Sequence, residues 1–337
     1  MEPNPGSQVS VQAPSSVAVI VRTKDRPRFL ERALNDIFAQ TYRRFRVVIV
    51  NDGGLPESIK GVVGRLPETV REQITVVHHE QSRGMEAASN AGIRSCDSEY
   101  IAIHDDDDLW HPEFLQRTVS HLDNYSDAGV VVRTNIRYEE IVGDEIRETG
   151  SEPFWGNMQQ ISLGEMLQIN RAVPISFLYR RSLHEELGYF DEKLDVCGDW
   201  EFNIRILARH TIGFLDGQPL AFWSQRPAAS GADANSIFDK EEDHRRFDRR
   251  VRDQYLRKDL AAGGMGMLLE VGRMMDDQER LLLENRRQLD AMQTHLNEAL
   301  RRLEDTVTRR TSFSGILRRG GTATEMFRGA LRGKSRK

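Results

Sequence analysis

The feature that most constrains the fold is a repeating alternation of short apolar runs with helical patterns. Four runs rich in β-branched residues lie at 17–23, 46–50, 74–79 and 100–104. Between them apolar residues recur at helical spacing, beginning after Pro27. Continuous apolar runs are typical of strands buried on both faces, and strands that alternate with helices indicate a mostly parallel α/β sheet with right-handed crossovers.

Polar clusters follow three of these runs, at the strand ends where open α/β sheets bind ligands. They are Thr23 to Asp25, Asn51 to Gly53, and Asp105 to Asp108. Four adjacent carboxylates repel one another and stay ionised only beside a cation or a cluster of donors. A hard divalent ion, held by one or two carboxylates and substrate phosphates, supplies that charge. A solvated acidic turn that caps a helix is the simpler alternative.

The second half of this body is less regular. After Pro112 we expect a helix and then a strand at 129–133. The stretch 134–165 is mixed in character, and we expect a loop-rich insert near the acceptor side. A helix at 199–208 and a strand at 212–215 follow.

Composition is that of a large globular body. The chain has 337 residues, of which 39% are hydrophobic and 29% charged. Two cysteines, Cys96 and Cys197, offer neither a disulfide framework nor a zinc-ligand spacing, which suits a reducing compartment. Neither a run of about 18 apolar residues nor the apolar core of a signal peptide is apparent. We therefore expect a cytoplasmic protein.

The C-terminal part differs from the body. A heptad column predicts a coiled coil and self-association through 268–306; its members are Leu268, Met275, Leu282, Leu289, Leu296 and Leu303. The segment 309–337 holds nine basic residues and one acid. Such a tail favours an anionic membrane surface over nucleic acid, because the body is acidic.

These observations divide the chain into four expected parts. They are a disordered lead (1–15), an α/β domain (16–260), a helical coiled-coil region (261–310) and a basic amphipathic tail (311–337).

Four segments, in this order, resemble the family 2 glycosyltransferases of the GT-A fold: VAVIVRTKDRPRFLERAL, VVIVNDGG, RGMEAASNAGIRSCDSEYIAIHDDDDLW and FDEKLDVCGDWEFNIRI. The resemblance covers about residues 16–230. It implies a GT-A domain whose first half binds a nucleotide-diphosphate sugar and whose Asp-x-Asp motif holds Mg2+ or Mn2+. It also implies a reaction that inverts the anomeric centre by direct displacement.

The resemblance assigns donor-side roles to individual residues. The Asp-x-Asp motif is Asp105-Asp106-Asp107, in which Asp105 faces the ribose or the metal and Asp107 is the main metal ligand. Asp52 is matched to the aspartate that accepts from the ring N–H of the base. Thr23 and Asp25 are matched to the loop that surrounds the base after the first strand. Arg83 is matched to a cation that reaches the diphosphate. A surface salt bridge is an equally good explanation of Arg83.

On the acceptor side the resemblance assigns the catalytic base to Asp199, which is also placed to cap the following helix. The family often has glutamate before this aspartate, where this chain has Gly198. Many members carry a histidine in the region matching 222–226, and this chain has none there, which leaves Arg226 as the candidate for that contact. Among the aromatic residues, candidates for the sugar sites are Trp110, Trp155 and Trp223.

The resulting hypothesis is an inverting, metal-dependent glycosyltransferase that uses a nucleotide-diphosphate sugar, with a lean toward UDP. Its acceptor is expected to be a lipid-linked saccharide in surface polysaccharide or O-antigen assembly, at the inner face of the cell membrane. One alternative is a sugar-phosphate nucleotidyltransferase, disfavoured because VRTKDRPRF lacks the glycine-rich phosphate loop. Another is an inactive scaffold protein, against which Asp105, Asp107 and Asp199 argue.

Overall fold

A computed structural model describes residues 16–143, 145–229, 231 and 241–311. The chain separates into two units, Met1–Gln254 and Tyr255–Lys337. The expected lead and nearly all of the expected basic tail lie outside the described residues.

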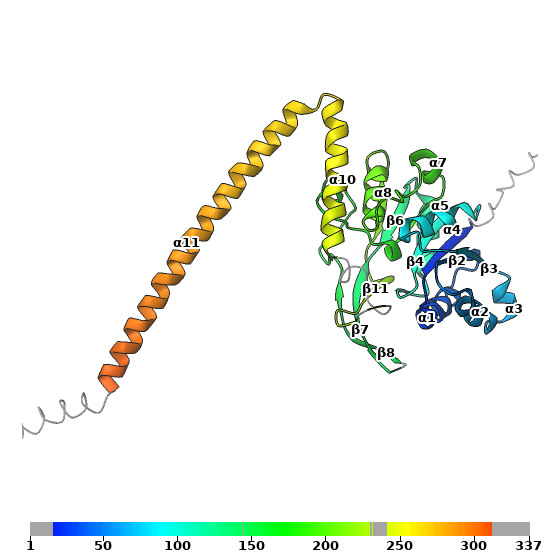
Figure 1. Ribbon diagram of the computed structural model, residues 1–337, viewed down its shortest axis with the longest axis horizontal. Coiled ribbons are helices and arrows are strands. Elements are labelled where there is room, and N and C mark those ends of the chain that lie inside the picture. Colours follow the sequence, from blue (N-terminus) through cyan, green and yellow to red (C-terminus); the bar gives the residue numbers. More distant parts are fainter. Residues whose placement is uncertain (1–15, 144, 230, 232–240, 312–337) are drawn as a thin grey trace, which may run out of the picture. The chain divides into compact units, whose positions relative to one another are not determined.

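The first unit is built on a seven-stranded sheet in the order β10-β6-β9-β4-β1-β2-β3 (Figure 1). Its strands are β1 (Val17–Thr23), β2 (Phe45–Asp52), β3 (Ile74–His79), β4 (Tyr100–Asp105), β6 (Gly129–Val132), β9 (Phe177–Arg180) and β10 (Ile212–Leu215). All neighbours pair in parallel except β9, which is antiparallel to β4 and β6. The predicted mostly parallel sheet is therefore confirmed.

The central strands are apolar because both faces of the sheet are covered. Val17 to Val21 of β1 are at most 1% exposed. The helix α1 (Pro27–Phe38) starts at a proline, whose fixed φ suits a first turn, and buries Leu30, Leu34 and Ile37 in the same core. The other helices of the domain are α2 (Pro56–Gly64), α3 (Glu68–Arg71), α4 (Met85–Arg94), α5 (Phe114–Asn124), α6 (Leu163–Gln168), η1 (Pro174–Ser176), α7 (Leu183–Leu187) and α8 (Gly198–Leu207).

The expected loop-rich insert is instead part of a second, four-stranded sheet, so that expectation is wrong. The sheet has the order β5-β11-β7-β8. Its strands are β5 (Leu109–Trp110), β7 (Thr134–Val142), β8 (Glu145–Pro153) and β11 (Ala221–Gln225). The hairpin strand β8 is mostly exposed and rich in charge, so it lacks the apolar run or clean alternation by which a strand is recognised.

The helix α10 (Glu241–Ala261) carries the chain from the first unit into the second. Its first half packs on the α/β domain through Phe247 and Val251, which are 3% and 2% exposed.

The second unit contains α11 (Met265–Thr311), a single helix of 47 residues. Its heptad column lies on the surface: Met275, Leu282, Leu289, Leu296 and Leu303 are 60% to 68% exposed. In the part of the chain that the structure describes, no helix combines the length and the apolar character needed to cross a bilayer.

Candidate active site

The parallel sheet brings the polar ends of β1, β2 and β4 to one edge. Thr23 lies opposite Asn51 in the β1–β2 pairing, and Arg22 lies opposite Asp105 in the β1–β4 pairing. Two of the polar clusters predicted from the sequence therefore flank the third. This edge is also the end of the sheet at which α/β folds bind ligands.

Asp105 is bound by an arginine from the neighbouring strand. Both of its carboxylate oxygens accept hydrogen bonds of 2.8 Å from Arg22, one from Nε and one from a terminal nitrogen. This is the two-pronged geometry in which a guanidinium group binds a carboxylate most strongly. The side chain of Asp105 is 30% exposed, and it is the most accessible carboxylate of the run.

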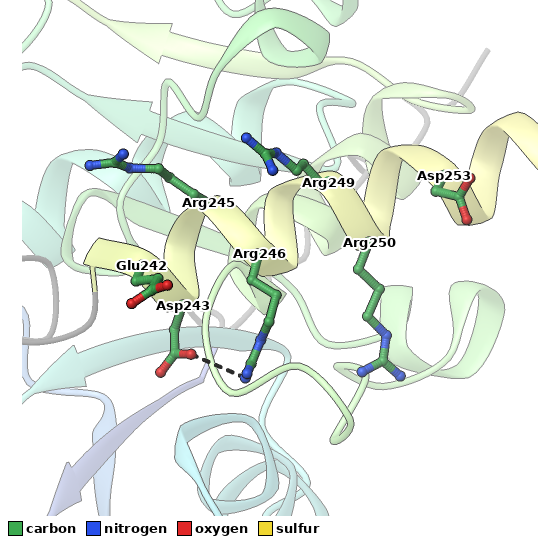
Figure 2. A pocket seen from close by; sticks show the side chains of 7 residues that line it. All are labelled: Glu242, Asp243, Arg245, Arg246, Arg249, Arg250 and Asp253. Atoms are coloured by element: carbon green, nitrogen blue, oxygen red, sulfur yellow. Dashed lines mark ion pairs between the residues drawn. The ribbon is translucent and has the colours of Figure 1, made fainter.

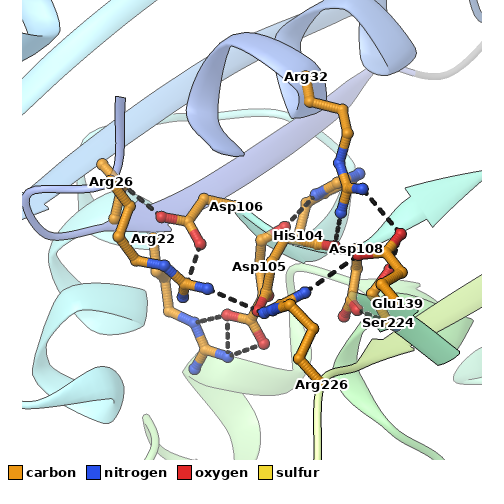
Figure 3. A network of polar contacts seen from close by, with 12 residues as sticks. Arg22, Arg26, Arg32, His104, Asp105, Asp106, Asp108, Glu139, Ser224 and Arg226 are labelled. Carbon is orange, nitrogen blue, oxygen red and sulfur yellow. Dashed lines mark hydrogen bonds and ion pairs between the residues drawn. The ribbon is translucent and has the colours of Figure 1, made fainter. Parts of the chain in front are cut away.

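Asp106 is buried and has a different set of partners. The hydroxyl of Thr23 donates to its carboxylate at 2.7 Å. Arg26 lies 3.0 Å from the other carboxylate oxygen (Figure 3). Burial raises the pKa of Asp106 to about 7, and the positive charge of Arg26 offsets that effect only in part. The Asp106 carboxyl is therefore harder to ionise than an ordinary aspartate.

Asp107 is bound by two arginines from distant parts of the chain. Arg26 donates to its Oδ2 at 2.8 Å, and Arg226 forms an ion pair with the same oxygen. Arg226 is itself buried and lies 3.2 Å from Glu139 on β7. Burial disfavours the charge of Asp107, but Arg26 and Arg226 outweigh it and hold the pKa of that carboxyl below its ordinary value.

Asp108 joins the run to the second sheet. Its Oδ1 accepts a hydrogen bond of 2.8 Å from the backbone N–H of Ser224 on β11. Burial and the neighbouring charges of Asp107 and Asp105 raise its pKa well above the ordinary value. Burial thus disfavours the charges of Asp106 and Asp108, whereas arginines favour the charge of Asp107, so the environment of these three neighbours favours fewer than three negative charges.

The residues expected to hold a metal do not fit a metal ion in this arrangement. Guanidinium groups already bind the carboxylates of Asp105 and Asp107. Across residues 16–143, 145–229 and 241–311, no three acidic, histidine or cysteine side chains gather as a metal ion requires. The positive charge that the sequence demanded is supplied here by Arg22, Arg26 and Arg226.

Asp52 organises the loop that precedes α4. Its carboxylate accepts hydrogen bonds from the backbone N–H groups of Arg83 and Gly84, at 2.9 and 3.0 Å, and from Ser82 and His79, both at 2.7 Å. Burial raises the pKa of Asp52, but these donors outweigh that effect and the pKa lies below its ordinary value. The carboxylate expected to accept from a nucleotide base is therefore engaged in holding the Ser82–Gly84 turn.

The other two donor-side candidates lie at the rim of this edge. Asp25 has a positive φ of 52°. Its Oδ1 accepts from the backbone N–H of Leu55 at 2.7 Å, and this bond ties the loops after β1 and β2 together. The Arg83 side chain is 58% exposed and lies 3.3 Å from Glu192, so it forms the surface salt bridge that the sequence left open as an alternative.

Asp199 lies in the wall of a cavity of about 700 Å3 that Asp105 also lines. Its Oδ2 accepts a hydrogen bond of 2.7 Å from the side chain of Asn170. Burial raises the pKa of Asp199, against the opposing effects of the Trp200 N–H, Arg22 and Asn170. The cap of α8 is Cys197, in a left-handed conformation, and not Asp199, because the helix starts at Gly198.

Aromatic side chains line the same cavity. Phe154, Trp155 and Trp223 belong to its wall, and the rings of Phe154 and Trp223 meet edge to face at 5.4 Å. Trp110, by contrast, is 3% exposed and stacks on Phe114, so it belongs to the core and not to a sugar site.

Sequence reasoning missed several polar residues of this cavity, among them Arg22, Glu86 and Asn170. Arg22 is a charged residue inside an otherwise apolar strand, which is a signal that the sequence does display. Glu86 and Asn170 show no comparable signal, because each acts through a residue more than 25 positions away in the chain.

Comparisons with known proteins agree with this geometry. The profile of Glycosyl transferase family 2 matches residues 18–188. One relative is the uncharacterized glycosyltransferase YwdF of Bacillus subtilis, which is 30% identical over 56% of this chain and 67% of YwdF. Another is the amylovoran biosynthesis glycosyltransferase AmsE of Erwinia amylovora, which is 28% identical over 37% of this chain and 46% of AmsE. The alignment thus spans less than half of AmsE.

Solved structures show the same fold. Staphylococcus aureus TarS bound to UDP superposes with a TM-score of 0.51 at 19% identity, over 63% of this chain and 61% of that one. Its complex with UDP-GlcNAc gives a TM-score of 0.53 at 17% identity, over 65% and 61%. With a profile match over half its length and a GT-A architecture, the chain belongs to Glycosyl transferase family 2.

Proposed function

We propose that this protein is an inverting glycosyltransferase that moves a sugar from a nucleotide-diphosphate sugar to a saccharide acceptor. The observation that carries the proposal is that Asp105, at the donor edge of the sheet, and Asp199 line the same cavity. A donor bound at the strand ends and an acceptor beside Asp199 would meet in that space. The role of AmsE in amylovoran biosynthesis supports an acceptor from surface polysaccharide assembly.

The proposed step is a direct displacement at the anomeric carbon. A bond forms between an acceptor oxygen and C1 as the bond from C1 to the diphosphate oxygen breaks, and Asp199 takes the hydroxyl proton. The raised pKa of Asp199 suits this role, because a carboxylate with a higher pKa is a stronger base. Asn170 holds the carboxylate in place by its hydrogen bond of 2.7 Å.

The donor is proposed to lie along the ends of β1, β2 and β4, and to be a UDP-sugar. The support for uridine is the TarS complexes with UDP and UDP-GlcNAc, which share the fold. In this proposal Thr23, Asp25 and the Asp52-held turn shape the nucleotide site. Asp105, the most accessible carboxylate of the run, faces the donor.

The charge of the diphosphate leaving group needs a positive partner. Mg2+ or Mn2+ is the partner that the family resemblance implies, through Asp105 and Asp107. Because arginines bind those carboxylates here, we assign the neutralising charge to Arg22 and Arg26, and no step of the proposal passes through a metal. Of these two side chains Arg26 is the more accessible, at 19% exposed.

The test is a panel of sugar nucleotides offered to the full-length protein, with and without a saccharide acceptor and with and without Mn2+. Release of the nucleoside diphosphate with inversion at C1 supports the proposal. Release of pyrophosphate from a nucleoside triphosphate and a sugar phosphate would identify a nucleotidyltransferase instead. Binding of no nucleotide at all would leave the scaffold alternative.

A further inference from the structure

The helix α10 places a row of charged residues along the cavity that contains Asp199. His244, Arg245, Asp248 and Arg249 line that cavity, and their spacing puts them on one face of the helix. The buried residues Phe247 and Val251 hold the helix against the domain. The position of this row is thus fixed by packing on the same unit that carries Asp199.

Four arginines in the first half of α10 point in two directions. Arg245 and Arg249 extend from one side of the helix, and Arg246 and Arg250 extend from the other (Figure 2). All four also line a hollow of about 1020 Å3 along the helix. Only Arg245 and Arg249 belong in addition to the cavity with Asp199.

The row contains two arginines and one carboxylate where it meets the cavity. Its one carboxylate, Asp248, accepts a hydrogen bond of 3.0 Å from Arg252, which compensates its charge. On the opposite side, Arg246 pairs with Asp243 at 3.0 Å and Arg250 donates to the backbone oxygen of Lys193. None of the described residues pairs with the guanidinium group of Arg249.

We propose that Arg249 and Arg245 form an anion subsite that binds a phosphate or diphosphate group of the acceptor. Guanidinium groups bind phosphate oxygens in pairs, and two of them one helical turn apart suit a group with more than one negative charge. The acceptor class is therefore a saccharide attached to a phosphate ester, such as a lipid diphosphate. This inference rests on the proposed glycosyl transfer.

The donor diphosphate is the other source of the same chemistry. It is expected at the ends of β1 and β4, where Asp105 lies, and the arginine row belongs to α10. Substitutions on α10 should therefore weaken the binding of an anionic acceptor and leave the binding of the nucleotide unchanged.

The experiment uses the full-length protein, first saturated with whichever of UDP, GDP or ADP it binds best. Titration with farnesyl diphosphate then measures the subsite, and farnesol serves as the uncharged comparison. Arg249→Gln should weaken the binding of farnesyl diphosphate about tenfold, as expected for the loss of charge-assisted hydrogen bonds. The double variant Arg245→Gln/Arg249→Gln should weaken it further. Farnesol binding should not change.

Arg250→Gln is the matched control, because it removes the same charge from the other side of α10. It should change the affinity for farnesyl diphosphate less than about twofold, because an exposed charge away from the ligand contributes little binding energy. Equal losses in Arg250→Gln and Arg249→Gln would overturn the subsite. An equal loss of nucleotide affinity in Arg249→Gln would assign the arginines to the donor.

Failure of the inference and failure of the proposed function give different results. If the protein binds a nucleotide but not farnesyl diphosphate, the subsite is wrong and the glycosyl transfer stands. If it binds none of the nucleotides and none of the sugar nucleotides, the proposed function itself fails. Thermal unfolding of each variant shows whether the exposed substitutions have left the fold intact.

Discussion

The backbone N–H of Gly198 donates to the carboxylate of Glu86 at 3.1 Å. The Glu86 side chain, from α4, therefore occupies the space beside Gly198, which directly precedes Asp199 in the chain. A Cβ added at Gly198 would lie 2.4 Å from the Glu86 Cδ. In family 2 glycosyltransferases a glutamate often precedes the catalytic aspartate. In this chain Glu86 brings a carboxylate to that place from 112 residues away.

Gly198→Ala should therefore impair transfer, because Glu86 is 4% exposed and cannot move aside freely. We expect a loss of about tenfold or more in kcat/KM and a destabilisation of about 1–3 kcal/mol, typical of overpacking. Steady-state kinetics and thermal unfolding measure both. The double variant Gly198→Ala/Glu86→Ala should recover part of the stability. No recovery would mean that the clash is not with Glu86.

Asp199→Asn should keep nucleotide binding and lose transfer by about 10²–10⁴, because the base is removed and the nucleotide site is left intact. Calorimetry with the nucleotide and rates with the identified donor separate the two effects. Transfer at near wild-type rate would remove Asp199 from the mechanism.

Asn170→Ala should shift the pH dependence of transfer. Asn170 donates to Asp199 and so favours its ionised form. Without that bond the pKa of Asp199 rises further, and because the base acts ionised, the acidic limb of kcat/KM should move to higher pH. Asn124→Ala, at the exposed end of α5, is the control. If the acidic limb of kcat/KM stays at the same pH while the rate falls, Asn170 positions the Asp199 carboxylate without affecting its pKa.

Nucleotide binding should persist in a metal chelator, because arginines already compensate Asp105 and Asp107. We expect the Kd in EDTA to stay within about threefold of that in Mn2+, a difference under about 1 kcal/mol. Arg226→Ala removes one of the two guanidinium groups from Asp107 and should lower the Tm equally in Mn2+ and in EDTA, because Arg26 still binds that carboxylate. Loss of nucleotide binding in EDTA and its return with Mn2+ would instead restore the metal to Asp105 and Asp107.

The exposed leucine column of α11 should drive self-association, because a helix of this length leaves its apolar stripe in water as a single chain. Sedimentation of the full-length protein should show an oligomer, and Leu289→Asp should dissociate it. Leu283→Asp removes an exposed leucine outside the column and is the matched control. Equal behaviour of the two variants, or a monomeric wild type, would contradict the prediction.

The sequence by itself determined the sheet and the edge that carries the site. Strands buried on both faces must be apolar along their whole length, so β1 and β4 are visible as runs, and parallel connection brings their ends together. The hairpin of β7 and β8 escaped the same reasoning. The strand β7 is mostly half-buried and β8 is mostly exposed, and cross-strand partners stabilise them in place of a buried run.

Only the tertiary structure decided what neutralises the acidic run. The sequence required a positive charge near Asp105 to Asp108, and a divalent cation or a set of guanidinium groups meets that requirement equally well. Arg26 and Arg226 reach Asp107 from 81 and 119 residues away. Such contacts follow from how the two sheets pack, because the strength of an ion pair depends on distance and burial, which the order of residues along the chain does not contain.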